Sequence, residues 1–221
     1  IGWCDWSSDV CSSDLMALYV AGEILPRDDL AVAVVGPRSP STHGREAARR
    51  ISEGLARAGL TVVSGFAAGV DGLAHMAALA AGGRTLAALG CGLAVNYPAE
   101  HESLRRKILE SRAGALLSEL PMTAQAMRHH FPARNALIAG LALAVVVIEA
   151  AENSGALLTA HAALEEGRTV FAVPGDITRT TSRGSNALLR EGAIALTCAE
   201  ELLEDLRPQI EPLYAAHGVA A

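Results

Sequence analysis

Short apolar runs without polar alternation recur along the chain, and this pattern limits the possible folds more than any other sequence feature. The runs are Ala31–Val35, Thr61–Ser64, Thr85–Leu89, Ala115–Leu117, Ala144–Glu149 and Thr169–Val173. Unbroken apolar runs predict strands that are buried on both faces of a sheet. Helical stretches lie between most of these runs, which predicts parallel strands joined by crossover helices. We therefore predict an α/β fold with a doubly wound, mostly parallel, Rossmann-like sheet.

The two ends of the chain differ in composition from the middle. Residues 1–15 contain both tryptophans, two of the four cysteines and a repeated Ser-Ser-Asp. This segment resembles translated sequencing-adapter sequence, so we interpret it as a non-native leader. The alternative is a Cys-x6-Cys metal or disulfide hairpin, although a metal site would need a second ligand pair. We expect one domain over residues 16–206, followed by a flexible tail at 207–221.

The charge is unevenly distributed along the chain. The net charge is −6, which argues against a uniformly basic surface for nucleic acid. Residues 16–198, however, carry 17 basic and 16 acidic side chains. No acid lies between Glu119 and Glu149, or between Asp176 and Glu191, and both stretches contain arginines. An acidic protein can therefore present a local basic face to an anionic polymer, and arginines scattered over a solvated surface are the alternative.

Several classes of protein are excluded by what the sequence lacks. The longest apolar runs fall far short of the roughly 20 residues of a membrane span, and no basic segment leads into an apolar one at the start. The cysteines form no Cys-x-x-Cys pair, so neither a zinc site nor a redox motif is indicated. We expect a soluble, cytoplasmic protein with reduced cysteines, no metal and no cofactor.

The loop after the first long apolar run, residues 36–44, contains groups that suit phosphate. In a doubly wound sheet, ligands bind at the carboxyl ends of the strands. This loop lacks the Gly-x-Gly-x-x-Gly pattern of dinucleotide-binding proteins. It offers Arg38, Ser39 and Ser41 at a helix N-terminus instead, where charge-assisted hydrogen bonds can hold phosphate oxygens.

The next two loops are rich in glycine but carry no catalytic set. Gly65 and Gly69 lie between a strand and a helix, and Asp71 and His75 lie on one face of that helix. A structural Asp–His contact is one interpretation and an acid/base pair is the other, but no nucleophile or second carboxylate accompanies them. Cys91 lacks a neighbouring base, so a small buried thiol is expected. We predict that the protein is not an enzyme.

Residues 128–135 interleave cations with one of only three phenylalanines, Phe131. Arginine beside an exposed aromatic ring is a combination that single-stranded nucleic acid uses, with phosphate on the cation and a base on the ring. Inward packing of Phe131 is the alternative. Two later helix starts add further candidate ligands for anions, namely Ser154, Gly155, Arg183 and Asn186.

Seven segments in this order resemble the DNA-processing protein A (DprA, or Smf) family. They are VAVVGPR (32–38), VVSGFAAGVDGLAH (62–75), GCGLAVNYP (90–98), FPARNALIAGL (131–141), EAAENSGALLTA (149–160), VFAVPGD (170–176) and RGSNALLREGA (183–193). The resemblance is collinear over about residues 18–198. It implies an extended Rossmann fold that binds single-stranded DNA, forms homodimers and loads the RecA recombinase during natural transformation, without a known catalytic reaction.

The resemblance assigns roles to individual positions. It makes Arg38 a phosphate ligand, places Arg128 at the basic position before the Phe-Pro-x-Arg-Asn motif, and makes Phe131 the aromatic against which a base lies. Arg134 and Asn135 begin the Arg-Asn-Arg motif of the family. The predicted DNA-binding residues are Arg38, Ser39, Ser41, Gly65, Gly69, Arg128, Phe131, Arg134, Asn135, Ser154, Gly155, Arg183 and Asn186.

Two departures from the family pattern remove positive charge. Ala68 and Ala136 stand where the family usually has basic residues, which predicts a weakened or altered affinity for DNA. A rival class is a nucleotide-binding hydrolase of the phosphoribohydrolase type, which is expected to have a Pro-Gly-Gly-x-Gly-Thr loop. Here Pro174 and Gly175 are followed by Asp176, and the pattern does not continue. A third possibility is an assembly protein that binds RecA without DNA.

Overall fold

The computed structural model describes residues 17–217 and confirms the predicted α/β fold. The strands are β1 (Tyr19–Gly22), β2 (Ala31–Val35), β3 (Thr61–Ser64), β4 (Thr85–Ala88), β5 (Gly114–Ser118), β6 (Ala144–Val147), β7 (Thr169–Ala172) and β8 (Ile194–Ala195). The helices are α1 (Thr42–Arg57), α2 (Val70–Ala80), α3 (Glu102–Glu110), α4 (His130–Gly140), α5 (Gly155–Glu165), α6 (Arg183–Arg190), α7 (Ala199–Asp205) and α8 (Arg207–His217). Short 3₁₀ turns include η1 (Pro26–Asp29).

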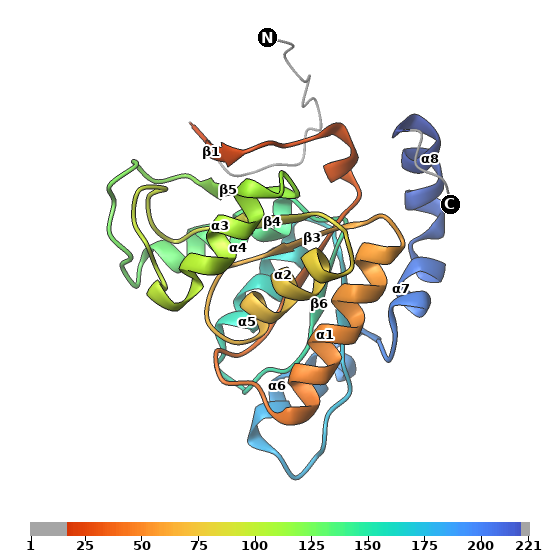
Figure 1. The fold of residues 1–221 in the computed structure, drawn as a ribbon. Helices are drawn as coiled ribbons and strands as arrows, with labels where there is room; N and C mark the ends of the chain where they lie inside the picture. The colour runs from red at the N-terminus through yellow and green to blue at the C-terminus, as the bar shows by residue number, and fades with distance from the viewer. Residues whose placement is uncertain (1–16, 218–221) are drawn as a thin grey trace.

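The sheet winds outward in both directions from β2. Its strand order is β1-β5-β4-β3-β2-β6-β7-β8, and every pair except β1 with β5 is parallel (Figure 1). The chain runs from β2 through β3 and β4 to β5 and then returns along α4 to β6, on the other side of β2. The direction of winding therefore changes between β2 and β6. In open sheets of this kind, such a switch point is where ligands bind, outside the carboxyl ends of the strands.

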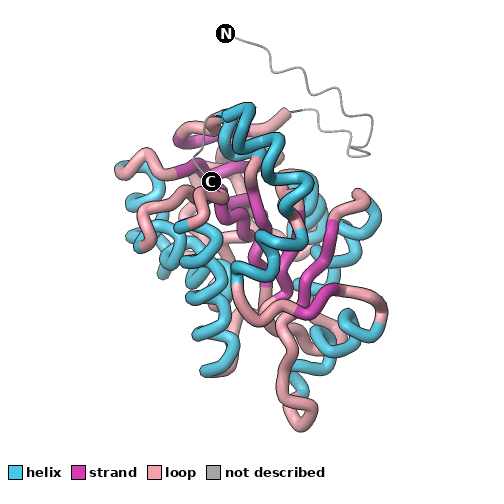
Figure 2. Tube along the Cα trace, turned by 90° about the vertical axis from the view of Figure 1, so that its right-hand side faces the viewer, coloured by secondary structure: helices cyan, strands magenta, loops and turns pink. Residues whose placement is uncertain are grey.

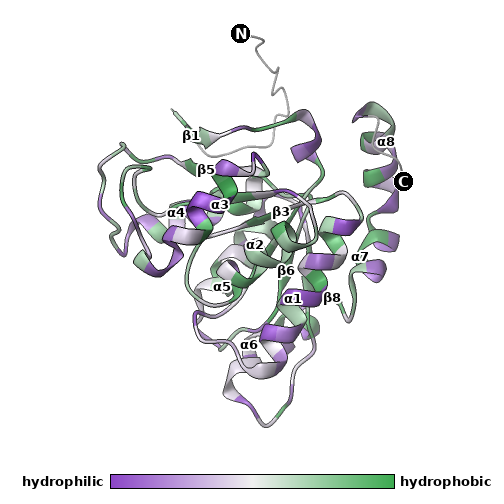
Figure 3. Ribbon diagram, viewed as in Figure 1, coloured by the Kyte–Doolittle hydropathy of each residue, from purple (hydrophilic) through white to green (hydrophobic). Residues whose placement is uncertain are grey.

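The strands lack polar alternation because helices cover both faces of the sheet, as Figure 2 shows. In β2, Val32 and Val34 pack with α1 and α2 in one core, whereas Ala33 and Val35 pack with α4 and α5 in a second core. All of β2 is buried. Figure 3 shows the same division, with hydrophobic strands inside and hydrophilic residues on the outer surfaces of the helices.

A buried ion pair between Arg84 and Asp28 lies at the edge of the sheet where the parallel strands begin. No sequence pattern indicated it. Arg84 donates from Nε to Asp28 Oδ1 and from Nη2 to Asp28 Oδ2, both at 2.8 Å. Thr61 also donates to Asp28, at 2.7 Å, and Arg84 bonds the backbone carbonyls of Glu23 and Arg112. Because each charge is hydrogen-bonded, this network is satisfied in the absence of water. It ties η1 to the starts of β3 and β4.

Residues 207–217, part of the segment expected to be a flexible tail, form helix α8. α8 contains Pro212, but it buries Ile210, and Tyr214 donates from its hydroxyl to the carbonyl of Ala58. His217 lies 3.3 Å from Asp29. These contacts hold the helix against α1 and η1. The expected leader at residues 1–15 lies outside the described residues. None of the described helices has the length and apolar character that crossing a membrane requires.

Candidate nucleic-acid interface

A cavity of about 310 Å³ opens at the switch point of the sheet. It lies among the loops after β2 and β3, the first half of α4 and the start of α5. Of the predicted DNA-binding residues, it is lined by Arg38, Phe131, Arg134, Asn135, Ser154 and Gly155. The chain reversal between β2 and β6 thus brings together residues that are more than a hundred positions apart in the sequence.

Phe131 lies between two arginines. The guanidinium carbons of Arg38 and Arg134 lie 5.4 and 5.6 Å from the ring centroid, within the range of cation–π attraction. Arg38 is exposed and Phe131 is half-buried, so part of the ring borders the cavity. Tyr97 is 38% exposed, and its ring centroid lies 6.4 Å from that of Phe131. Gly90 allows Phe131 to approach, since a Cβ there would lie 2.9 Å from the ring.

Arg134 is buried, and the structure gives it partners within the protein. Its Nη1 donates to the carbonyls of Gly65 and Ala88, at the carboxyl ends of β3 and β4. Gly65 is required here because a side chain would collide with the guanidinium. Burial lowers the pKa of Arg134, although nearby Asp71 opposes that shift. Arg134 therefore holds two strand ends together and presents its charge to the cavity from behind Phe131.

Asp71 and His75 do not form the pair considered from the sequence. Asp71 Oδ2 accepts from the Ala67 amide at 3.2 Å, and burial raises the pKa of its carboxyl while Arg134 opposes the rise. His75 Nδ1 lies 2.6 Å from the Thr85 hydroxyl, which itself donates to the carbonyl of Val62. His75 is fully buried, and burial lowers its pKa to about 3. It is thus a neutral core histidine.

The start of α5 forms the opposite wall of the cavity. Ser154 is the N-cap residue by its backbone, but its hydroxyl is buried and has no hydrogen-bond partner within residues 17–217. Asn135 Nδ2 donates to the Gly155 carbonyl at 3.3 Å, which fixes α4 against α5. The amides in the first turn of a helix lack intrahelical partners and carry partial positive charge. This wall of the cavity therefore favours an anion.

Ser41 caps α1, and its partner is a protein carboxylate. Its hydroxyl accepts from the Gly44 amide at 3.0 Å and donates to Glu149, whose other oxygen accepts from the Ser41 amide at 2.9 Å. Glu149 is 2% exposed and lies at the end of β6. The N-terminus of α1 thus already holds an anion. Ser39 is exposed in the same loop, outside the lining of the cavity.

Gly69 lets the first two loops pack against each other. Its φ is +86°, and an added Cβ would collide with the carbonyls of Pro37 and Arg38. The Val70 amide donates to the Pro37 carbonyl at 3.2 Å. Gly69 therefore positions the Arg38 loop at the rim of the cavity and does not line it.

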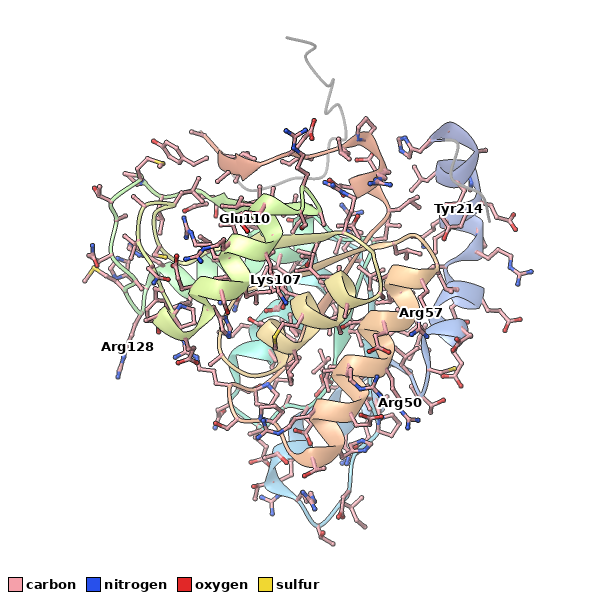
Figure 4. The ribbon with its side chains drawn as sticks, viewed as in Figure 1. Arg50, Arg57, Lys107, Glu110, Arg128 and Tyr214 are labelled. Atoms are coloured by element: carbon pink, nitrogen blue, oxygen red, sulfur yellow. The ribbon has the colours of Figure 1, made fainter. Side chains whose placement is uncertain are left out.

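The remaining predicted residues, Arg128, Arg183 and Asn186, do not line the cavity. Arg128 is exposed and points outward at the edge of the molecule (Figure 4). Asn186 bonds both backbone groups of Gly175, at 3.1 and 3.0 Å, which anchors that loop. Arg183 lies 3.9 Å from Glu152, and Arg179 lies 3.6 Å from Asp176. The positive charge of the acid-free stretch between Asp176 and Glu191 is thus partly neutralised in the fold, because Asp176 and Glu152 lie near its arginines.

Tyr97 lies beside Phe131 but does not line the cavity, and it was not predicted from the sequence. It lies in the Gly90–Pro98 segment, in which only the glycines and Cys91 were considered from the sequence. An exposed aromatic beside Phe131 could have been found only by knowing that this loop folds toward α4. Among the described residues, no group of three or more His, Cys, Asp or Glu side chains is placed to hold a metal ion.

The fold and site define a Rossmann-like α/β protein with an arginine- and aromatic-lined cavity at the switch point of its sheet. The family model described as DNA recombination-mediator protein A matches residues 8–207. The chain belongs to this family.

Relatives and solved structures agree with this assignment. Protein Smf of Escherichia coli K12 is 45% identical over 191 residues, which cover 86% of this chain and 51% of that protein. The chain thus spans about half the length of this curated relative. The X-ray structure of DprA from Streptococcus pneumoniae superposes with a TM-score of 0.77 at 41% identity, over 85% of this chain and 65% of the other. DprA from Helicobacter pylori, from a study of its single-stranded DNA binding mode, gives 0.81 at 28% identity and 91% coverage of both chains.

Proposed function

We propose that this chain binds single-stranded DNA in the switch-point cavity and acts as a recombination mediator. In this role it delivers the bound strand to a RecA-type recombinase during DNA uptake. It acts by binding, without a catalytic step, as a homodimer in the cytoplasm. Family membership supports the role as mediator, and the single-stranded DNA binding mode of the Helicobacter pylori protein supports single-stranded DNA as the ligand.

The observation that carries the proposal is the placement of Arg38, Phe131 and the start of α5 around one cavity. Arg38 is exposed beside the half-buried ring, so one nucleotide can place its phosphate on the guanidinium and its base against the ring. The unpartnered Ser154 hydroxyl and the first amides of α5 offer a second phosphate position across the cavity. Duplex DNA keeps its bases stacked inside, so it cannot use the ring.

Few cations line this cavity. Arg134 is 7% exposed and its Nη1 donates to two carbonyls, and Ala68 and Ala136 stand at positions where basic residues were expected. We therefore expect binding to depend on stacking and on hydrogen bonds as well as on ion pairs. The affinity should fall with salt, but with the slope of a few phosphate contacts.

The test is a fluorescence anisotropy titration of labelled oligo-dT, with duplex DNA of the same length for comparison. Arg38→Ala should weaken oligo-dT binding about tenfold and make the log–log salt slope less negative by about 0.7. Arg57→Ala is the matched control: it removes the same charge from an exposed position on α1, where the side chain lies 3.7 Å from Glu53. This control should bind like the parent protein.

Absence of oligo-dT binding at low salt would overturn the proposal, as would equal affinity for duplex DNA. Equal losses in the two arginine variants would assign the binding to net charge and not to this cavity. The hydrolase alternative predicts release of free base from AMP by the purified protein. Our proposal predicts none, because the Pro174–Asp176 loop does not continue into the pattern expected of such enzymes.

A further inference from the structure

A second cavity of about 310 Å³ lies farther along the carboxyl edge, where β4 and β5 end. It is lined by Leu89, Glu119, Leu120, His129, His130, Ala133 and Arg134. Arg134 lines both cavities, and the first turn of α4 separates them. Because Arg134 borders both cavities, a strand of DNA that leaves the first cavity past Phe131 can continue along the carboxyl edge to the second.

The walls of this second cavity are tied in place by hydrogen bonds. Ser118 accepts from the Leu120 amide at 3.1 Å and donates to the Cys91 carbonyl at 2.8 Å. The amides of Gly92 and Ala94 donate to the carbonyls of Ala124 and Met122, both at 2.8 Å. The loops after β4 and β5 therefore hold each other. Leu89, Leu120 and Ala133 give the cavity apolar surface that suits a flat ring.

Two polar groups in this cavity lack partners within the described residues. The Glu119 carboxylate makes no hydrogen bond or ion pair with residues 17–217, although the side chain is only half-buried. Burial raises its pKa. His130 Nδ1 is buried and also has no partner in that part of the chain. The His130 ring packs edge-on against His129, with centroids 4.3 Å apart.

The chemistry of these groups narrows the class of ligand. A carboxylate only accepts hydrogen bonds, and it repels phosphate. A divalent cation is not favoured, because Glu119, His129 and His130 do not come together as a metal-binding group. A neutral, flat ligand that donates hydrogen bonds fits both the acceptor and the apolar walls. Amino-bearing nucleobases have this character, and carboxylates accept from the N4 amino group of cytosine in protein–DNA complexes.

We propose that this cavity is a second base subsite, in which Glu119 accepts a hydrogen bond from the exocyclic amino group of a nucleobase. The proposal rests on the proposed function, since it assumes that single-stranded DNA occupies the neighbouring cavity. Phe131 would then stack one base regardless of its identity, whereas Glu119 selects amino-bearing bases at another position along the strand.

The test compares oligo-dC with oligo-dU of equal length in anisotropy titrations at low salt and pH 8. Cytosine and uracil differ at the 4-position, where one carries an amino donor and the other a carbonyl acceptor. The ratio of the oligo-dC affinity to the oligo-dU affinity should be at least about fivefold higher in the parent protein than in Glu119→Gln. The variant adds an amide donor that suits uracil, so its two affinities should converge.

Glu110→Gln is the matched control, because Glu110 is an exposed acid on α3 (Figure 4). It should keep the preference of the parent protein. An oligo-dU affinity in Glu119→Gln that is at least equal to that of the parent protein verifies that the variant is folded. If both oligonucleotides bind but the dC-to-dU ratio is the same with and without Glu119, this subsite is excluded and the proposed function stands. If neither binds to the parent protein, the proposed function itself fails.

Discussion

Arg38 and Arg134 lie at similar distances from the Phe131 ring, but their surroundings give them different roles. Arg38 is exposed in the loop after β2, whereas Arg134 is 7% exposed and its Nη1 donates to two strand-end carbonyls. A guanidinium that already satisfies buried carbonyls cannot leave them for a phosphate without leaving those acceptors unpaired. We therefore expect Arg38 to bind phosphate directly and Arg134 to support the wall of the cavity.

Tyr97 is predicted to extend the stacking surface of Phe131. Tyr97→Ala should weaken oligo-dT binding by about fivefold or more, since a base–aromatic stack contributes about 1–3 kcal/mol. Tyr97→Phe keeps the ring and should bind like the parent protein. Anisotropy titrations of the two variants check this expectation. Equal losses in both would assign the effect to the hydroxyl group and contradict stacking.

At this scale, the residue types of the site could be predicted from the sequence, but their exposure could not. Arg38, Phe131, Ser154 and Gly155 were predicted to bind DNA, and the structure places all four around one cavity. The same reasoning predicted Arg134 as a DNA-binding residue, but nothing in the sequence shows that it is buried and donates to the carbonyls of two strand ends. Exposure depends on packing between distant segments, which local sequence does not record.

Among the elements, α1 shows how a protein carboxylate can occupy a helix N-terminus. Glu149 at the end of β6 receives hydrogen bonds from the amide and hydroxyl of Ser41. A Cβ at Gly44 would lie 2.5 Å from Glu149 Oε2, so a glycine is needed there for the carboxylate to approach. The arrangement links the loop after β2 to β6 directly behind the cavity. These hydrogen bonds therefore fix the position of the loop that contains Arg38.

Ser41→Ala should destabilise the fold with little direct effect on phosphate binding. Loss of the N-cap typically costs about 1–2 kcal/mol, and here it also leaves the buried Glu149 with one fewer donor. Urea denaturation of the variant checks this. Ser39→Ala is the matched control, because Ser39 is exposed in the same loop, and its free energy of unfolding should not change. Equal stability of the two variants would contradict the capping role.

The elements that sequence patterns missed are those with weak periodicity. β1 has four residues, pairs antiparallel with β5 and is mostly exposed, so it lacks the apolar run that identified the other strands. β8 has only two residues. α8 has Pro212 in its interior, where proline disfavours a helix, and contacts of Ile210 and Tyr214 hold it in place. The buried strands were predictable because their environment requires an unbroken apolar run.

For the whole molecule, His75 links folding to pH. Its pKa is about 3 in the fold and about 6.5 when the chain is unfolded, so between these values only the unfolded state takes up the proton. The free energy of unfolding should therefore fall as the pH decreases from 6.5 to 5, with a slope of up to about 1.4 kcal/mol per pH unit from this residue. The raised pKa of Asp71 acts in the opposite direction.

Comparison with His75→Asn separates these effects, because Asp71 is present in both proteins. Urea denaturation at several pH values between about 5 and 6.5 should give a smaller slope for the variant than for the parent protein. The same slope in both would mean that His75 takes up a proton in the folded state as readily as in the unfolded one. That result would contradict a neutral, buried histidine.

The placement of the DNA strand along the carboxyl edge of the sheet is tested most directly by a crystal structure of the protein with a short oligo-dT. We predict a phosphate within hydrogen-bond distance of the Arg38 guanidinium, a base against the Phe131 ring, and the strand passing Ser154 at the start of α5. A strand bound elsewhere, for example against Arg50 and Arg57 on α1 or Lys107 on α3, with the switch-point cavity empty, would contradict this placement (Figure 4).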